Sequence, residues 1–169
     1  DETRPGKPVI KVMIDGDVTD AGLAGMVELK DLQSLTIHSR KNVDAAFKGL
    51  GADKLEALDI QGCKMTELVA AEISQLKGLR TLDVDFTGLT DDELRKFSDL
   101  KQLQMLELAG TNVTSEGLKY LAGLTSLRHL KISGKLAPDA GLQELAGLTQ
   151  LESLNLGFTP LTDAGMKEI

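Results

Sequence analysis

The side chains best suited to chemistry in this sequence are carboxylates that recur at a fixed interval. Asp59, Asp83 and Glu107 are each 24 residues apart, and Asp85 follows two residues after the central one. If a regular parallel sheet places them in one column, neighbouring carboxylates lie about 4.8 Å apart and repel each other. Three interpretations are open: a solvated polar face, a surface that recognises a cationic partner, or a cluster that holds a metal ion or catalyses a reaction.

Two histidines and one cysteine complete the set of candidate ligands and nucleophiles. His38 precedes the run of carboxylates and His129 follows it, so a regular array places the two histidines too far apart to bind one ion. Cys63 is the single cysteine, which excludes an internal disulfide and a structural zinc cluster. No nucleophile occurs with a base and an orienting group, so we expect no enzyme activity, no cofactor and no metal.

An internal repeat of 23 or 24 residues must position these side chains. Its first, fourth and sixth positions are aliphatic in every one of the seven repeats. The repeats start at Val9, Leu32, Leu55, Leu79, Leu103, Leu127 and Leu151. Each predicts a strand around positions 3 to 6, followed by a short helix with inward apolar residues. Because one repeat cannot bury its own apolar face, stacked repeats must share a core.

The repeats resemble the leucine-rich repeat. The rows LQMLELAGTNVTSEGLKYLAGLTS and LESLNLGFTPLTDAGMKEI are similar to its cysteine-containing-like subclass and to bacterial tandem-repeat proteins of this family. The resemblance covers residues 9–169 and implies an α/β fold, a right-handed solenoid with a parallel concave sheet and short convex helices. Residues 1–8 lie outside it, and their polar sequence with two prolines predicts a disordered lead-in.

Positions that recur from one repeat to the next predict local roles for several threonines and glycines. At position 9, where that subclass often has cysteine, Cys63 and three threonines predict a buried polar ladder, interrupted at Arg40 and Lys135. A buried thiol at this position is chemically inert. Threonines after the strands predict helix N-caps, and glycines inside the helices predict close approach to the next repeat. The cap and glycine sites are Thr90, Thr114, Thr162, Gly22, Gly117, Gly141 and Gly165. The seventh repeat lacks its last apolar residue, so its strand is expected to be an exposed sheet edge.

The charge balance argues against two classes of partner. The 169 residues include 26 acidic and 19 basic ones, and the net charge is −7 with a pI near 4.9. We therefore expect no binding to nucleic acid or to anionic membranes. No apolar run reaches the roughly 18 to 20 residues that span a bilayer. The start at Asp1 without a methionine favours an extracytoplasmic location, and the oligomeric state stays open.

The outward face of the predicted sheet is the candidate functional surface. Positions 2, 3, 5, 7 and 8 of each repeat point to this side. We expect a noncatalytic module that binds a protein or peptide with basic groups there. The expected partner-binding residues are Asp59, Asp83, Asp85, Glu107, Phe86, Lys131, His129 and His38. Two alternatives remain: a structural or assembly segment of a larger repeat protein, and a carboxylate-based metal-binding or enzymatic site.

Overall fold

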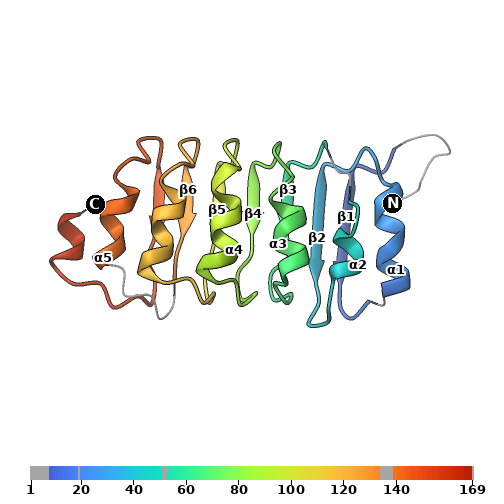
Figure 1. The fold of residues 1–169 in the computed structure, drawn as a ribbon, viewed down its shortest axis with the longest axis horizontal. Coiled ribbons are helices and arrows are strands. Elements are labelled where there is room, and N and C mark those ends of the chain that lie inside the picture. Colours follow the sequence, from blue (N-terminus) through green and yellow to red (C-terminus); the bar gives the residue numbers. More distant parts are fainter. Residues whose placement is uncertain (1–7, 19, 51–52, 134–138, 169) are drawn as a thin grey trace.

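The computed structural model describes residues 8–18, 20–50, 53–133 and 139–168, and each repeat in it is a strand, a turn and a short helical segment (Figure 1). The strands are β1 (Lys11–Asp15), β2 (Ser34–His38), β3 (Ala57–Asp59), β4 (Thr81–Asp83), β5 (Met105–Glu107), β6 (His129–Lys131) and β7 (Ser153–Asn155). The α-helices are α1 (Asp20–Ala24), α2 (Asp44–Phe47), α3 (Glu67–Ile73), α4 (Asp91–Lys96) and α5 (Asp139–Leu142). The 3-10 helices are η1 (Gly25–Glu28), η2 (Phe97–Asp99), η3 (Ser115–Leu121), η4 (Gln143–Leu145) and η5 (Gly165–Lys167).

The strands form one parallel sheet in which neighbours in sequence are neighbours in space. The order is β1-β2-β3-β4-β5-β6-β7. The register pairs equivalent repeat positions, so Leu58 lies opposite Leu82 and Leu82 opposite Leu106. In Figure 1 the strands follow one another along the long axis, and the helices lie in a second row on one side of them. The predicted α/β solenoid is confirmed, and the sheet face turned away from the helices is its concave face.

The aliphatic residues at positions 1, 4 and 6 form the core between the sheet and the helices. In the second to sixth repeats all of these side chains are at most 2% exposed. Phe47 and Phe97 add fully buried rings from the helical side. Val12 and Leu154 are only partly buried, because β1 and β7 each pair with one strand among those described. Each repeat therefore depends on its neighbours for burial, as expected for a solenoid.

The helix N-termini are capped both within and between repeats. The Thr66 hydroxyl accepts the backbone N–H three residues later at 3.2 Å, and the Glu93 carboxylate accepts the Thr90 N–H at 3.0 Å. Thr114 behaves differently, because its backbone N–H and hydroxyl donate to Asp91 of the preceding repeat at 2.8 and 2.6 Å. The threonines expected to cap single helices thus also link successive repeats.

These links explain several of the helix glycines. A Cβ at Gly117 would lie 2.1 Å from Oδ1 of Asp91, and a Cβ at Gly165 would lie 2.1 Å from Oδ1 of Asp139. A Cβ at Gly141 would lie 2.6 Å from a backbone carbonyl oxygen of the preceding repeat. Side chains at these positions would collide with the adjacent repeat, which confirms the predicted close approach.

The predicted polar ladder at position 9 is present. Thr87 and Thr111 donate their hydroxyls to the carbonyl three residues earlier, at 2.7 and 2.8 Å. The Cys63 thiol donates to a backbone carbonyl of the preceding repeat at 3.1 Å, and burial raises its pKa. Arg40 is exposed, so the ladder is interrupted there, while Lys135 lies outside the described residues.

Three further features bear on the remaining expectations. Within the described ranges, no helix combines the length and the apolar character needed to cross a membrane. Among the described strands, β7 pairs with β6, and fast hydrogen exchange in β7 stays a prediction. The expected lead-in, residues 1–8, lies outside the described residues apart from Pro8, which is exposed.

Candidate functional site

The acidic column, which consists of Asp59, Asp83 and Glu107, crosses three adjacent strands of the concave face. Asp59 lies opposite Asp83, and Asp83 lies opposite Glu107. Lys131 on β6 continues the same row, opposite Glu107. Because side chains two residues apart on a strand share a face, Asp85 follows Asp83 on this side. The structure therefore brings together the carboxylates that the repeat spacing predicts.

Asp85 is buried, which corrects the expectation that it faces solvent. Its side chain is 0% exposed. One carboxylate oxygen accepts the backbone N–H of Ala109 at 2.6 Å, and the other accepts Nζ of Lys131 at 2.5 Å. Nζ of Lys131 also contacts Glu107 at 2.7 Å. Hydrogen bonds to Asp85 and then Glu107 raise the pKa of Lys131. The Lys131 side chain comes from two strands away, a contact that spacing within one repeat does not reveal.

Asp83 lies at the centre of the column, between Asp59 and Glu107. Among the described residues it forms no ion pair, and one of its oxygens accepts the backbone N–H of Asp85 at 2.9 Å. Burial, together with the negative charges of Asp85, Asp59 and Glu107, raises its pKa to about 6. The Asp85 N–H lowers that pKa but does not offset burial. Asp83 is thus partly protonated near pH 6, unlike an ordinary aspartate.

His38 joins the first three strands through two carboxylates. Its Nδ1 lies 2.8 Å from Asp15 on β1, and its Nε2 lies 3.0 Å from Asp59 on β3. A neutral imidazole has one N–H, so two ionised carboxylate acceptors require the doubly protonated ring. The hydrogen bond to Asp59 raises the pKa of His38, aided by the charges of both carboxylates and opposed by burial. His38 therefore neutralises one end of the acidic column, and Lys131 neutralises the other.

The structure does not bring His129 into these contacts. His129 lies on β6 opposite Met105, two residues before Lys131, and within the described part of the chain its ring forms no hydrogen bond or ion pair. The oxygens of Asp83, Asp85 and Glu107 lie within 4.8 Å of one another, which is a donor set that a hard divalent cation can use. The Lys131 ammonium already contacts two of these three groups, so a metal ion would have to displace it.

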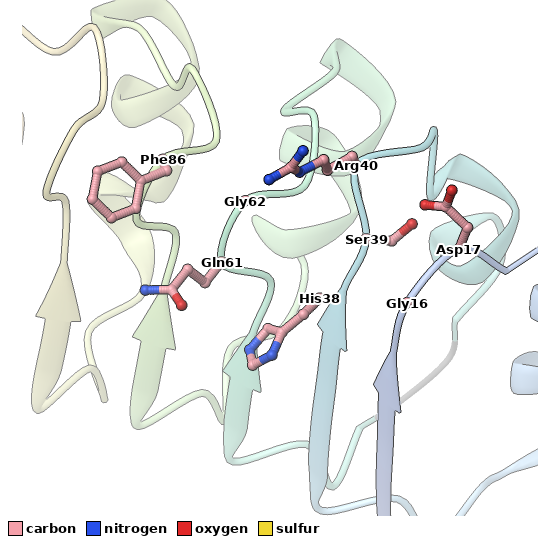
Figure 2. A pocket seen from close by; sticks show the side chains of 8 residues that line it. All are labelled: Gly16, Asp17, His38, Ser39, Arg40, Gln61, Gly62 and Phe86. Carbon is pink, nitrogen blue, oxygen red and sulfur yellow. The ribbon is translucent and has the colours of Figure 1, made fainter.

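A shallow pocket of about 540 Å³ lies where the first four strands end (Figure 2). We call it the turn pocket. Its lining residues are Gly16, Asp17, His38, Ser39, Arg40, Gln61, Gly62 and Phe86. Of these, Phe86 and His38 are among the residues predicted from the sequence. Figure 2 places Phe86 at one end and Asp17 at the other, with Arg40 and Gln61 between them.

Sequence reasoning missed Arg40 and Gln61 as parts of a pocket. The sequence predicts that the buried ladder is interrupted at Arg40, and the structure agrees: Ser39 is the buried residue at this turn, and Arg40 is exposed. An unpaired guanidinium is too costly to bury, so a charged residue at a ladder position could have indicated an outward turn. Position 8 offered a second signal, because it is glycine in four of the seven repeats and phenylalanine at Phe86 and Phe158.

Comparisons with known proteins identify the repeat. Two models described as leucine rich repeat match the sequence, one at residues 77–136 and one at residues 147–169. No curated protein matches the chain. The match within residues 77–136 includes Asp83, Asp85, Phe86, Glu107 and Lys131.

Two solved structures resemble the fold at low sequence identity. An internalin from Listeria monocytogenes is 20% identical with a TM-score of 0.67, over 87% of this chain and 40% of that one. The ectodomain of the Arabidopsis thaliana membrane receptor kinase GASSHO1/SCHENGEN3 is 15% identical with a TM-score of 0.55, over 89% of this chain and 21% of that one. The chain thus spans less than half the length of either protein, and at these identities the similarity concerns the fold.

Proposed function

Because this chain is a leucine-rich repeat protein, we propose that it is a noncatalytic module whose concave face binds a protein or peptide segment carrying a basic side chain. Leucine-rich repeat folds commonly mediate protein–protein binding through such extended surfaces. The similar receptor ectodomain was solved in complex with CASPARIAN STRIP INTEGRITY FACTOR 2. In this chain the basic side chain is received at the acidic column, with Asp83 as its main contact.

The observation that carries this proposal is the charge of Asp83. Asp59 has His38 as a partner, and Glu107 has Lys131. Asp83 lies between these two carboxylates and forms no ion pair among the described residues. Like charges opposite each other destabilise a sheet. A lysine or arginine from a partner supplies the missing positive charge at this point and relieves the repulsion.

A basic side chain suits this site better than a metal ion. A divalent cation needs several oxygens at once, and the Lys131 ammonium already contacts Asp85 and Glu107. An ammonium or guanidinium group can contact Asp83 alone and leave Lys131 in place. Loss of one such charge-assisted hydrogen bond weakens binding by about 1.5 to 3 kcal/mol, or roughly tenfold to a hundredfold.

A displayed library of random 12-residue peptides tests the proposal. We expect peptides selected on the wild-type protein to be enriched in lysine and arginine, and to bind more weakly as salt concentration rises. The D83N variant should lose this enrichment. The D99N variant is the matched control, because it removes one negative charge from exposed Asp99 on the helical side. Selected peptides without basic residues, or basic peptides that bind D83N as well as wild type, would show that the proposal is wrong.

A further inference from the structure

The eighth position of the repeat has a left-handed backbone in five of the six repeats in which it is described, and Ser39 of the second repeat is the exception. Its φ is +110° at Gly16, +74° at Gly62 and +64° at Gly110. Glycine adopts this left-handed region readily, because it has no Cβ. In the fourth and seventh repeats the same position is phenylalanine, with φ of +56° at Phe86 and +60° at Phe158. A bulky residue is strained here, so fold stability alone favours glycine at both sites.

The Phe86 ring is exposed and also held in place. Its side chain is 62% exposed. A Cβ added at Gly110 would lie 2.3 Å from the ring, so the ring rests where the neighbouring repeat lacks a side chain. Phe86 therefore presents a fixed apolar surface to solvent, which is the property of an anchor residue in a binding interface.

The floor of the turn pocket is open beside this ring. No atom lies within 4 Å of the place where a Cβ would be at Gly16 or Gly62. A side chain at either position would project into the pocket, as Phe86 does in the fourth repeat. The pocket volume of about 540 Å³ exceeds what one side chain fills.

Arg40 gives the pocket a positive charge. Among the described residues its guanidinium forms no hydrogen bond or ion pair, whereas Asp17 pairs with Lys41 at 3.8 Å. His38 is held by its two carboxylates. In Figure 2 the guanidinium of Arg40 extends toward the side of the pocket where Phe86 lies, and the Gln61 amide lies below the Phe86 ring. The pocket thus combines an apolar ring with a free, planar hydrogen-bond donor.

From this arrangement we infer that the turn pocket receives an acidic residue of the bound segment together with an adjacent apolar side chain. The carboxylate pairs with the Arg40 guanidinium, which is shaped for two parallel hydrogen bonds. The apolar side chain packs on Phe86. The inference rests on the proposed function, since the partner is the same segment. Asp83 and Phe86 lie three residues apart in the fourth repeat, so one bound segment that crosses this repeat can reach both.

N-acetyl-leucine, with a free carboxylate, is the probe for this pocket, and N-acetyl-leucinamide is its uncharged counterpart. Binding is followed through the backbone amide signals of Gly16 and Gly62 in NMR titrations of the whole chain. We expect N-acetyl-leucine to shift these signals with a dissociation constant of about 1 to 10 mM, as is usual for a fragment of roughly a dozen atoms. The amide should bind at least about tenfold more weakly.

Variants of the pocket residues assign the two contacts. R40Q should reduce binding of N-acetyl-leucine to the level of the amide, and F86G should weaken both probes without lowering the melting temperature. F158G is the matched control, because it relieves the same backbone strain at a residue that is 97% exposed and outside the pocket. Equal binding of the two probes, unchanged binding by R40Q, or no shift at Gly16 and Gly62 would overturn the inference.

The D83N variant separates this inference from the proposed function. N-acetyl-leucine carries no basic group, so its binding should be the same in D83N and in wild type. If the fragment binds the pocket while the peptide library yields no basic peptides, the proposed function fails and the pocket stands. If basic peptides depend on Asp83 while the fragment fails to bind, the pocket inference fails alone.

Discussion

Replacement of Asp83 by asparagine should stabilise the protein in a way that depends on pH. Asparagine keeps the oxygen that accepts the Asp85 N–H. Its neutral amide cannot ionise, so it places no negative charge between Asp59 and Glu107. In the wild-type protein the pKa of Asp83 is raised from 3.8 to about 6. The folded state therefore holds a proton that the unfolded state has already released between these two pH values, and the free energy of unfolding falls as pH rises.

The expected size follows from the two pKa values of Asp83. Ionising Asp83 at about pH 6 rather than at 3.8 removes up to about 3 kcal/mol of stability above pH 7. Water and salt screen this partly exposed group, which reduces the effect to about 1 to 2 kcal/mol. D83N should thus be more stable than wild type by about 1 to 2 kcal/mol at pH 7.5, or about 3 to 6 °C in melting temperature for a chain of this size. At pH 4 the gain should vanish.

Thermal and urea unfolding at pH 4, 5.5 and 7.5, followed by circular dichroism, measures this difference. The D99N variant controls for the loss of one negative charge from the whole protein and should show little change at any of these pH values. A gain for D83N that is equal at pH 4 and pH 7.5 would contradict the reasoning, as would a loss at pH 7.5. Either result would mean that burial and the neighbouring carboxylates do not make the charge of Asp83 unfavourable in the folded state.

Three further substitutions, one of them with a control variant, test other parts of the structure. The H38Q variant should be less stable than wild type by about 0.5 to 1 kcal/mol at pH 5.5. This difference in stability should shrink as pH rises through the elevated pKa of His38. Urea unfolding at pH 5.5 and pH 9 measures it. The K131M variant leaves Asp85 buried without its cation and should lose about 3 kcal/mol at pH 7 in urea unfolding. G117A should lower stability by about 1 to 2 kcal/mol in the same assay, because its methyl group meets Asp91, whereas G147A, which has open space around it, should be close to neutral.

The strand order and the core could be predicted because both depend on a pattern that each repeat carries in full. Leucines such as Leu82 and Leu106 occupy equivalent positions, so stacking fixes their depth and their neighbours at once. The acidic column followed for the same reason. The burial of Asp85 could not be predicted in this way, because it depends on Lys131, which lies 46 residues later and reaches across two strands.

The turn pocket could not be predicted from the repeat pattern, because it forms where the repeats differ from one another. The ladder position of the second repeat holds Arg40, and the backbone there turns the charged side chain outward and buries Ser39 instead. The left-handed backbone at Phe86 is a property of the turn, and glycine at the same position in other repeats indicated it only indirectly. Side-chain contacts between unlike repeats therefore need the structure.

Proton release on binding tests the central claim, recognition of a basic side chain at Asp83, most directly. A basic peptide selected on the wild-type protein is titrated by calorimetry at pH 6 in two buffers of different ionisation enthalpy. Because Asp83 is about half protonated at this pH, a cation that binds beside it should release about half a proton per complex. The D83N variant should release none and bind roughly tenfold or more weakly. Binding without proton release, at equal affinity in D83N, would contradict the account.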